Sequence, residues 1–202
     1  MLLVIDSATA ACSVALVEGS RLLEERHEVV GRGHAERLIP MIDGLLAGRR
    51  PSAILVDCGP GSFTGVRVGL AAAHGLAIGW GVPLTGYSSM AAIVAMSAAA
   101  GSAGVALHAG HGQIFVQSYG HGPIVPLDDL QSLPPDEAAA AMAPHLVLGS
   151  GAELLVMVRG YGEAVDALPR ASAAASLPET LRSLPPRPIY GRAPDAKPMA
   201  AQ

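Results

Sequence analysis

The chain reads Gly59-Pro-Gly-Ser-Phe-Thr-Gly-Val-Arg67 between a strand predicted over residues 53–58 and a helix predicted over residues 66–78. Such a glycine-rich turn presents free backbone N–H groups at a helix N-terminus, where an anion can accept them. It also allows a helix of small residues to pack closely on a sheet. A Walker loop is excluded because the turn has no lysine, and the dinucleotide fingerprint would need glycine at Thr64. Anion binding and close packing both remain open.

The polar groups near this turn define a candidate anion- or nucleotide-binding site. The first predicted strand ends at Asp6, and the turn after it lies where a first phosphate loop would be expected. The candidate residues are Asp6, Ser7, Thr9, Gly59, Gly61, Ser62, Thr64, Gly65 and Arg67.

Outward from this stretch, hydrophobic periodicity predicts an alternating α/β order. Three strands come first, then helix, strand, helix, strand and helix; they are predicted over residues 2–6, 12–17, 21–30, 34–46, 53–58, 66–78, 82–86 and 88–99. Three meandering strands followed by alternating helices and strands match the ribonuclease-H-like unit of the actin, Hsp70 and sugar-kinase superfamily. Pro40 must lie in the first turn of its helix or kink it.

The superfamily normally has two such lobes, and two further strands are predicted over residues 104–109 and 113–119. Because the sequence that follows is short and rich in proline and alanine, we expect a reduced second lobe. The predicted organisation is a first lobe over residues 1–100 and a smaller, degenerate one over residues 101–202. From Leu184 onward we expect an extended, proline-rich tail that is disordered at its end.

Composition limits the function classes. The chain has 17 acidic and 13 basic residues, so general attraction to the phosphate backbone of nucleic acids is not expected. Cys12 and Cys58 lie in apolar runs, which suits buried thiols in a reducing cytoplasm. No secretory signal is expected at the N-terminus. No charged residue occurs between Arg67 and Asp128, but glycine and proline interrupt this stretch, so buried sheet and a subunit interface are favoured over a membrane span.

The glycine-rich stretch and the small-residue helix after it resemble the signature of the TsaB (YeaZ) family. The resemblance extends to Leu3–Leu16, Gly33–Met41, Gly86–Ser89 and Tyr190–Arg192, and it is dense over residues 1–95. It implies a non-catalytic subunit that binds and activates TsaD in forming threonylcarbamoyladenosine at position 37 of tRNA. It also implies contact with the ATPase TsaE, only indirect contact with tRNA, and no cofactor, metal or catalytic residue of its own.

The resemblance further implies that the first two helices pair with TsaD, or with a second copy when the chain is alone. The residues expected in this interface are His34, Leu38, Met41, Ile42, Leu45, Val68, Gly69, Ala72, Gly75 and Leu76. One departure is that many members open the second lobe with Asp-Ala-Arg, whereas this chain has His108-Ala-Gly110. No site is therefore assigned to that lobe.

Three enzymatic alternatives remain. A two-metal nuclease would use Asp6 and Asp57 with Glu36 as a third acid, since such chemistry needs clustered carboxylates. An ATPase or sugar kinase would use Asp6, Ser7 and Thr9 as a first phosphate loop and the turn from Gly59 to Gly65 as a second phosphate contact. A zinc peptidase would need clustered histidines, but His108 and His111 flank a predicted glycine turn, and His34 and His74 stand alone.

Overall fold

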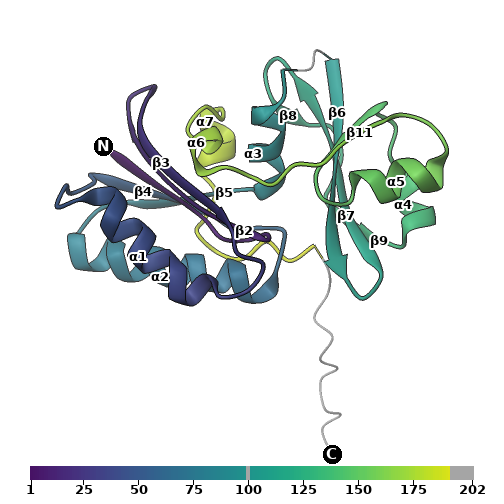
Figure 1. Ribbon diagram of the computed structural model, residues 1–202. Coiled ribbons are helices and arrows are strands. Elements are labelled where there is room, and N and C mark those ends of the chain that lie inside the picture. The colour runs from purple at the N-terminus through teal and green to yellow at the C-terminus, as the bar shows by residue number, and fades with distance from the viewer. Residues whose placement is uncertain (99–100, 192–202) are drawn as a thin grey trace, which may run out of the picture.

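The computed structural model describes residues 1–98 and 101–191, without the side chain of His121, and it forms two lobes side by side (Figure 1). The first lobe contains β1 (Leu2–Asp6), β2 (Ala11–Glu18), β3 (Arg21–Val29), α1 (His34–Leu46), β4 (Ala53–Asp57), α2 (Phe63–Trp80), β5 (Leu84–Tyr87) and α3 (Ser89–Met96). The second contains β6 (Gly101–Gly110), β7 (Gln113–His121), β8 (Val125–Pro126), β9 (Gln131–Leu133), α4 (Pro135–Ala141), β10 (Leu146–Leu148), α5 (Ala152–Arg159) and β11 (Glu163–Val165). In the described ranges, no helix is both long and apolar enough to cross a bilayer.

The first sheet has the strand order β3-β2-β1-β4-β5. β1 pairs antiparallel with β2 and parallel with β4, and β4 pairs parallel with β5. This is the ribonuclease-H-like arrangement that the sequence predicts. α2 begins at Phe63, three residues before the predicted start, because Ser62 caps the helix by accepting a hydrogen bond from the Gly65 N–H at 3.3 Å.

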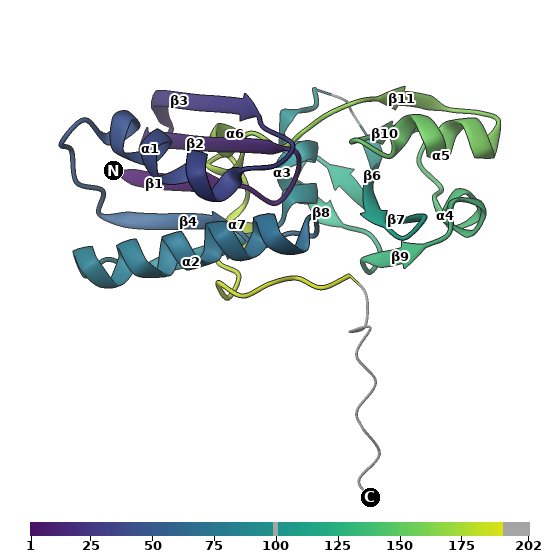
Figure 2. The same cartoon turned by 60° about the horizontal axis from the view of Figure 1, so that its bottom comes forward.

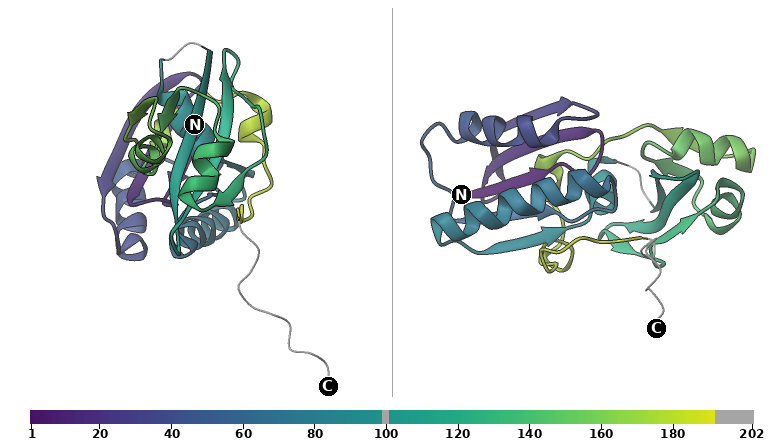
Figure 3. Two further views of the ribbon diagram at one scale, coloured as in Figure 1. Left: turned by 90° about the vertical axis from the view of Figure 1, so that its right-hand side faces the viewer. Right: turned by 90° about the horizontal axis from the view of Figure 1, so that it is seen from below.

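Successive side chains of β1 point to opposite faces of the sheet, so its apolar residues contribute to two separate core clusters. Leu3 and Ile5 belong to a core cluster with α1 and α2, which lie side by side over one face of the sheet (Figure 3). Val4 belongs to another cluster, which includes α3 and reaches Phe115 in the second lobe. Pro40 lies inside α1 rather than in its first turn, and its side chain is exposed.

The second sheet repeats the topology of the first. Its order is β8-β7-β6-β10-β11, with antiparallel pairs β6–β7 and β7–β8 and parallel pairs β6–β10 and β10–β11; β9 pairs with β7 outside this path. β6 and β7 have 10 and 9 residues, whereas β8, β9, β10 and β11 have only two or three, so the second lobe keeps the strand order of the superfamily with its other strands shortened.

After β11 the chain returns to the first lobe. α6 (Ala171–Ala174) is anchored where the Ala171 N–H donates to Ser13 Oγ at 3.0 Å, and α7 (Glu179–Arg182) follows. Leu184 then pairs with Gly86 at the edge of β5. Residues 171–191, which the sequence assigned to the second lobe and its tail, therefore pack largely on the first. The predicted disordered end lies outside the described residues.

Candidate functional site

Three glycines bring the start of α2 against the turn after β1. A Cβ atom on Gly61 would collide with the carbonyl oxygen of Ala8, and one on Gly65 would collide with that of Ser7. A Cβ atom on Gly69 would lie 2.5 Å from Ser7 Oγ. The Ser7 hydroxyl donates to the Gly65 carbonyl at 2.9 Å in a buried contact. The four-residue spacing of Gly61, Gly65 and Gly69 is thus explained by close packing of the helix on this turn.

This packing divides the predicted anion-binding set. Asp6, Ser7 and Gly65 are buried, and the Gly59 N–H donates to Asp57 Oδ1 at 2.8 Å. Gly59 has φ of 93°, a left-handed conformation that favours glycine. Thr64 is exposed, while Thr9, Gly61, Ser62 and Arg67 line a cleft described below. The structure therefore does not gather the nine residues around one anion.

Asp6 and Asp57 form a buried carboxyl pair at the ends of the parallel strands β1 and β4, with 0% and 1% of their surfaces exposed. Tyr87 Oη donates to Asp6 Oδ2 at 2.8 Å, and Ser89 Oγ donates to Asp57 Oδ2 at 2.6 Å. Asp6 Oδ1 is buried and lacks a partner among the described residues. Burial and the neighbouring charge of Asp57 raise the pKa of Asp6 well above its ordinary value, and burial raises that of Asp57 to about 6.

The arrangement does not suit a two-metal nuclease. Glu36, the expected third acid, is exposed in the first turn of α1, whereas the aspartates are covered by Tyr87 and Ser89. Across residues 1–98 and 101–191, no three His, Cys, Asp or Glu side chains are grouped to hold a metal ion. Cys12 and Cys58 are free and buried, and burial raises the pKa of their thiols to about 11 and about 12.

On α1, the predicted interface residues face inward. Leu38, Met41, Ile42 and Leu45 are buried in the cluster beneath the first sheet. His34 is also buried, and its Nε2 lies 3.2 Å from the Ala11 carbonyl oxygen. We therefore correct the sequence prediction for these five residues: the chain's own sheet and α2 cover them, which leaves no surface for a partner.

On α2, the predicted set is split between two sides. Gly69 faces Ser7, so it also belongs to the interior, while Val68, Ala72 and Leu76 are half-buried and Gly75 is exposed. The outward side holds Ala71, Gly75, Ile78 and Gly79, and the side chain of Ile78 is 82% exposed. A Cβ atom on Gly75 or Gly79 would meet nothing within 4 Å. Internal packing thus requires Gly65 and Gly69, but not Gly75 and Gly79.

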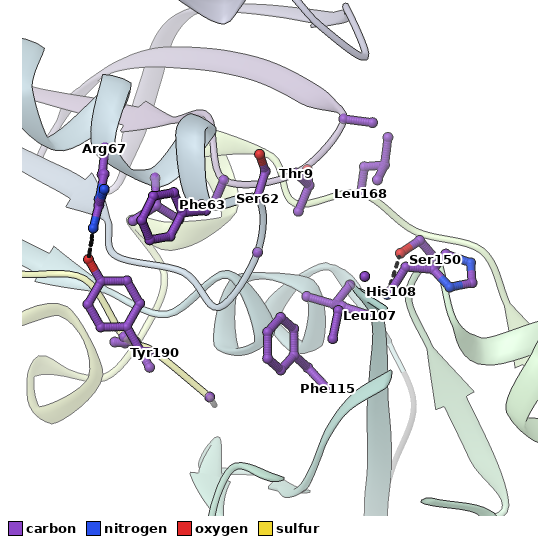
Figure 4. Close-up of a pocket in the computed structure, with 18 of the residues that line it drawn as sticks. Thr9, Ser62, Phe63, Arg67, Leu107, His108, Phe115, Ser150, Leu168 and Tyr190 are labelled. Atoms are coloured by element: carbon purple, nitrogen blue, oxygen red, sulfur yellow. Dashed lines mark hydrogen bonds between the residues drawn. The ribbon is translucent and has the colours of Figure 1, made fainter. Parts of the chain in front are cut away.

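The N-terminal end of α2 faces the second lobe (Figure 2), and a cleft of about 820 Å³ lined by residues of both lobes lies there (Figure 4). Phe63 and Phe115 lie on opposite sides of it, with Arg67 and Tyr190 at one end and His108 and Ser150 at the other (Figure 4). The sequence prediction included Thr9, Ser62 and Arg67 but not these aromatic residues. Two of these aromatic residues could have been found from the sequence, because Phe63 lies inside the glycine-rich motif and Tyr190 lies in the C-terminal stretch that resembles the family.

Two lobes with one repeated strand order, closed around an interlobe cleft, define a protein of the ribonuclease-H-like class found in the actin, Hsp70 and sugar-kinase superfamily. Residues 26–129 match the family model described as TsaD, tRNA N6-adenosine threonylcarbamoyltransferase. YeaZ from Pseudomonas aeruginosa is 31% identical, with a TM-score of 0.75 over 85% of this chain and 87% of that structure. A P. aeruginosa structure described as similar to peptidase YeaZ is 30% identical, with a TM-score of 0.79 over 95% and 99%. The chain belongs to the TsaB (YeaZ) family.

Proteins of similar sequence include a named TsaB protein. The Escherichia coli tRNA threonylcarbamoyladenosine biosynthesis protein TsaB is 40% identical over 94 residues, 44% of this chain and 40% of that protein. An uncharacterised Mycobacterium tuberculosis protein is 32% identical over 98% of this chain and 94% of its own length. The chain thus aligns with less than half of the E. coli relative but with almost all of the mycobacterial one.

Proposed function

We propose that this chain is an accessory subunit in the formation of N6-threonylcarbamoyladenosine at position 37 of tRNA, acting in the cytoplasm by binding TsaD rather than by catalysing a step. Relatives are named for this biosynthesis, and residues 26–129 match the TsaD family model itself. A partner that shares this fold can present a similar pair of helices. TsaE would join the pair, and tRNA would be contacted through TsaD.

The observation that carries the partner surface is the outward side of α2. Glycine inside a helix costs about 0.5–1 kcal/mol of stability relative to alanine. Packing within the chain does not require glycine at Gly75 or Gly79, because a Cβ atom at either position would meet no atom within 4 Å. Both glycines would allow the backbone of a partner helix to approach closely. Ile78 supplies exposed apolar surface beside them, and no charged residue follows Arg67 on this helix. When the chain is alone, a second copy can use the same surface.

The proposed action is thermodynamic. A subunit that binds only the productive arrangement of TsaD shifts its population toward that arrangement, by no more than the difference in affinity between the two states. Reconstitution tests this role: the cognate TsaD, TsaE and the enzyme that supplies threonylcarbamoyl-adenylate are combined with tRNA, with and without this chain. Full-rate modification without the chain would contradict the proposal.

The surface itself is tested by Ile78→Asp. Introducing a charge into an apolar interface should weaken association with TsaD by about tenfold or more, because desolvating an unpaired carboxylate is unfavourable. The side chain is already exposed, so stability of the isolated chain should change little. Association is followed by the mass of the complex in solution.

Met157→Asp is the matched control, since Met157 is 69% exposed on α5 of the second lobe. It should pair with TsaD as the parent chain does. Equal association of Ile78→Asp and Met157→Asp variants would show that TsaD does not use this side of α2.

A further inference from the structure

The interlobe cleft differs in charge from the chain as a whole. Seventeen acidic residues outnumber thirteen basic ones in the sequence, yet no aspartate or glutamate occurs among the described residues that line the cleft. The ionisable residues there are Arg67, His108, His111 and Tyr190. An anionic ligand would therefore meet one permanent positive charge and no carboxylate.

Arg67 is held in place but is not neutralised. Its Cζ lies 3.4 Å from the centre of the Phe63 ring, and its Nη2 donates to Tyr190 Oη at 2.9 Å. In the described part of the chain, no carboxylate forms an ion pair with it. A guanidinium has five N–H donors, and the hydrogen bonds to Tyr190 use the Nε and Nη2 sides, so the Nη1 donors stay available.

The walls supply apolar and aromatic surface. Phe63 is 60% exposed with Arg67 over its ring, and Phe115, which is 7% exposed and otherwise buried in the core, presents the remaining part of its surface on the opposite side of the cleft (Figure 4). The volume of about 820 Å³ falls in the range of about 300–1,000 Å³ typical of small-molecule sites. A planar ring fits between such walls better than an inorganic ion, which would leave their apolar surface uncovered.

We propose that this cleft binds a small aromatic anion, with its ring between Phe63 and Phe115 and its acidic group at Arg67. The acid can be a phosphate or a carboxylate, which share this chemistry. The proposal is independent of TsaD, because binding is measured on the full chain alone.

Anilinonaphthalene sulfonate is the first probe, since it combines a planar ring with one acidic group and becomes fluorescent in apolar surroundings. We expect saturable binding of one molecule per chain, with a Kd on the order of tens of micromolar for a ligand of about twenty heavy atoms. Arg67→Met should weaken it by about tenfold, because a charge-assisted hydrogen bond is lost. Arg67→Lys should recover most of the affinity.

Three controls define the site. Arg50→Met removes an exposed arginine beside Trp80, at the far end of α2, and should bind as the parent does. Uncharged N-phenylnaphthylamine should be indifferent to Arg67→Met, whereas Phe63→Ala should weaken both probes. Circular dichroism verifies that each variant is folded.

Competition identifies the acid: displacement by adenosine monophosphate but not by indole acetate assigns a phosphate, and the reverse assigns a carboxylate. If inorganic sulfate, which has no aromatic ring, displaces the probe, the proposed role of the ring is wrong. Absence of saturable binding, or equal affinity in the Arg67→Met and Arg50→Met variants, would overturn the proposal.

Discussion

Gly65→Ala should destabilise the chain by about 1–3 kcal/mol, because the added methyl group collides with the backbone carbonyl of Ser7. That carbonyl belongs to the turn after β1, so it cannot move away as a flexible side chain would. Relief of the collision requires α2 to shift from the sheet and to break the buried hydrogen bond from the Ser7 hydroxyl to the Gly65 carbonyl. The free energy of unfolding in urea measures the change.

Gly75→Ala is the matched control on the same helix. Its new methyl group meets no atom within 4 Å, so the higher helix propensity of alanine should stabilise the isolated chain by about 0.5–1 kcal/mol. The same substitution ten residues apart is thus expected to have opposite signs. Similar effects at both positions would contradict the assignment of an inward and an outward side to α2.

The buried pair Asp6 and Asp57 should make stability depend on pH. Their folded-state pKa values are raised, that of Asp57 to about 6 and that of Asp6 well above 3.8, so the folded chain binds protons more tightly than the unfolded chain. The pair's contribution is therefore fully present below pH 3.8 and is lost as pH rises through these folded-state values. The slope is at most about 1.4 kcal/mol per pH unit for each proton.

Asp6→Asn should remove most of this dependence, because an amide keeps the shape of the carboxyl group and carries no charge that burial disfavours. We expect the variant to gain stability relative to the parent as pH rises from 5 to 8, measured by thermal unfolding at each pH. Asp43→Asn, on the exposed side of α1, should retain the parental profile. A parental slope in the Asp6→Asn variant would mean that the pair releases no proton in this range.

Strand order was predictable because it depends on local hydrophobic period and on glycine turns. β1, β2, β4 and the helix after β4 can be recognised from apolar runs alone, and the repeated start of β6 and β7 follows from the same patterns. The destination of residues 171–191 could not be predicted in this way, because α6 is attached only by contacts between residues far apart in sequence, such as those from the Ala171 N–H to Ser13 Oγ and from the Ser172 N–H to Glu25 Oε1. Such contacts leave no periodic signal in the sequence.

The inward side of α1 was likewise decided by tertiary structure. Leu38, Met41, Ile42 and Leu45 form an apolar stripe whether their partner is the chain's own sheet or another protein, so the stripe by itself cannot identify that partner. Glycine has the same ambiguity on α2: Gly69 and Gly75 look alike in sequence, and only the position of Ser7 distinguishes them.

By itself, therefore, the sequence determined the order of strands and helices, the close-packed glycine turn and the family, because each depends on residues near one another in the chain. Tertiary structure alone decided which glycines lie inside, that Asp6 and Asp57 are covered, and that Phe63, Phe115 and Tyr190 surround one cleft. These features depend on distances between segments far apart in sequence, which local patterns do not encode.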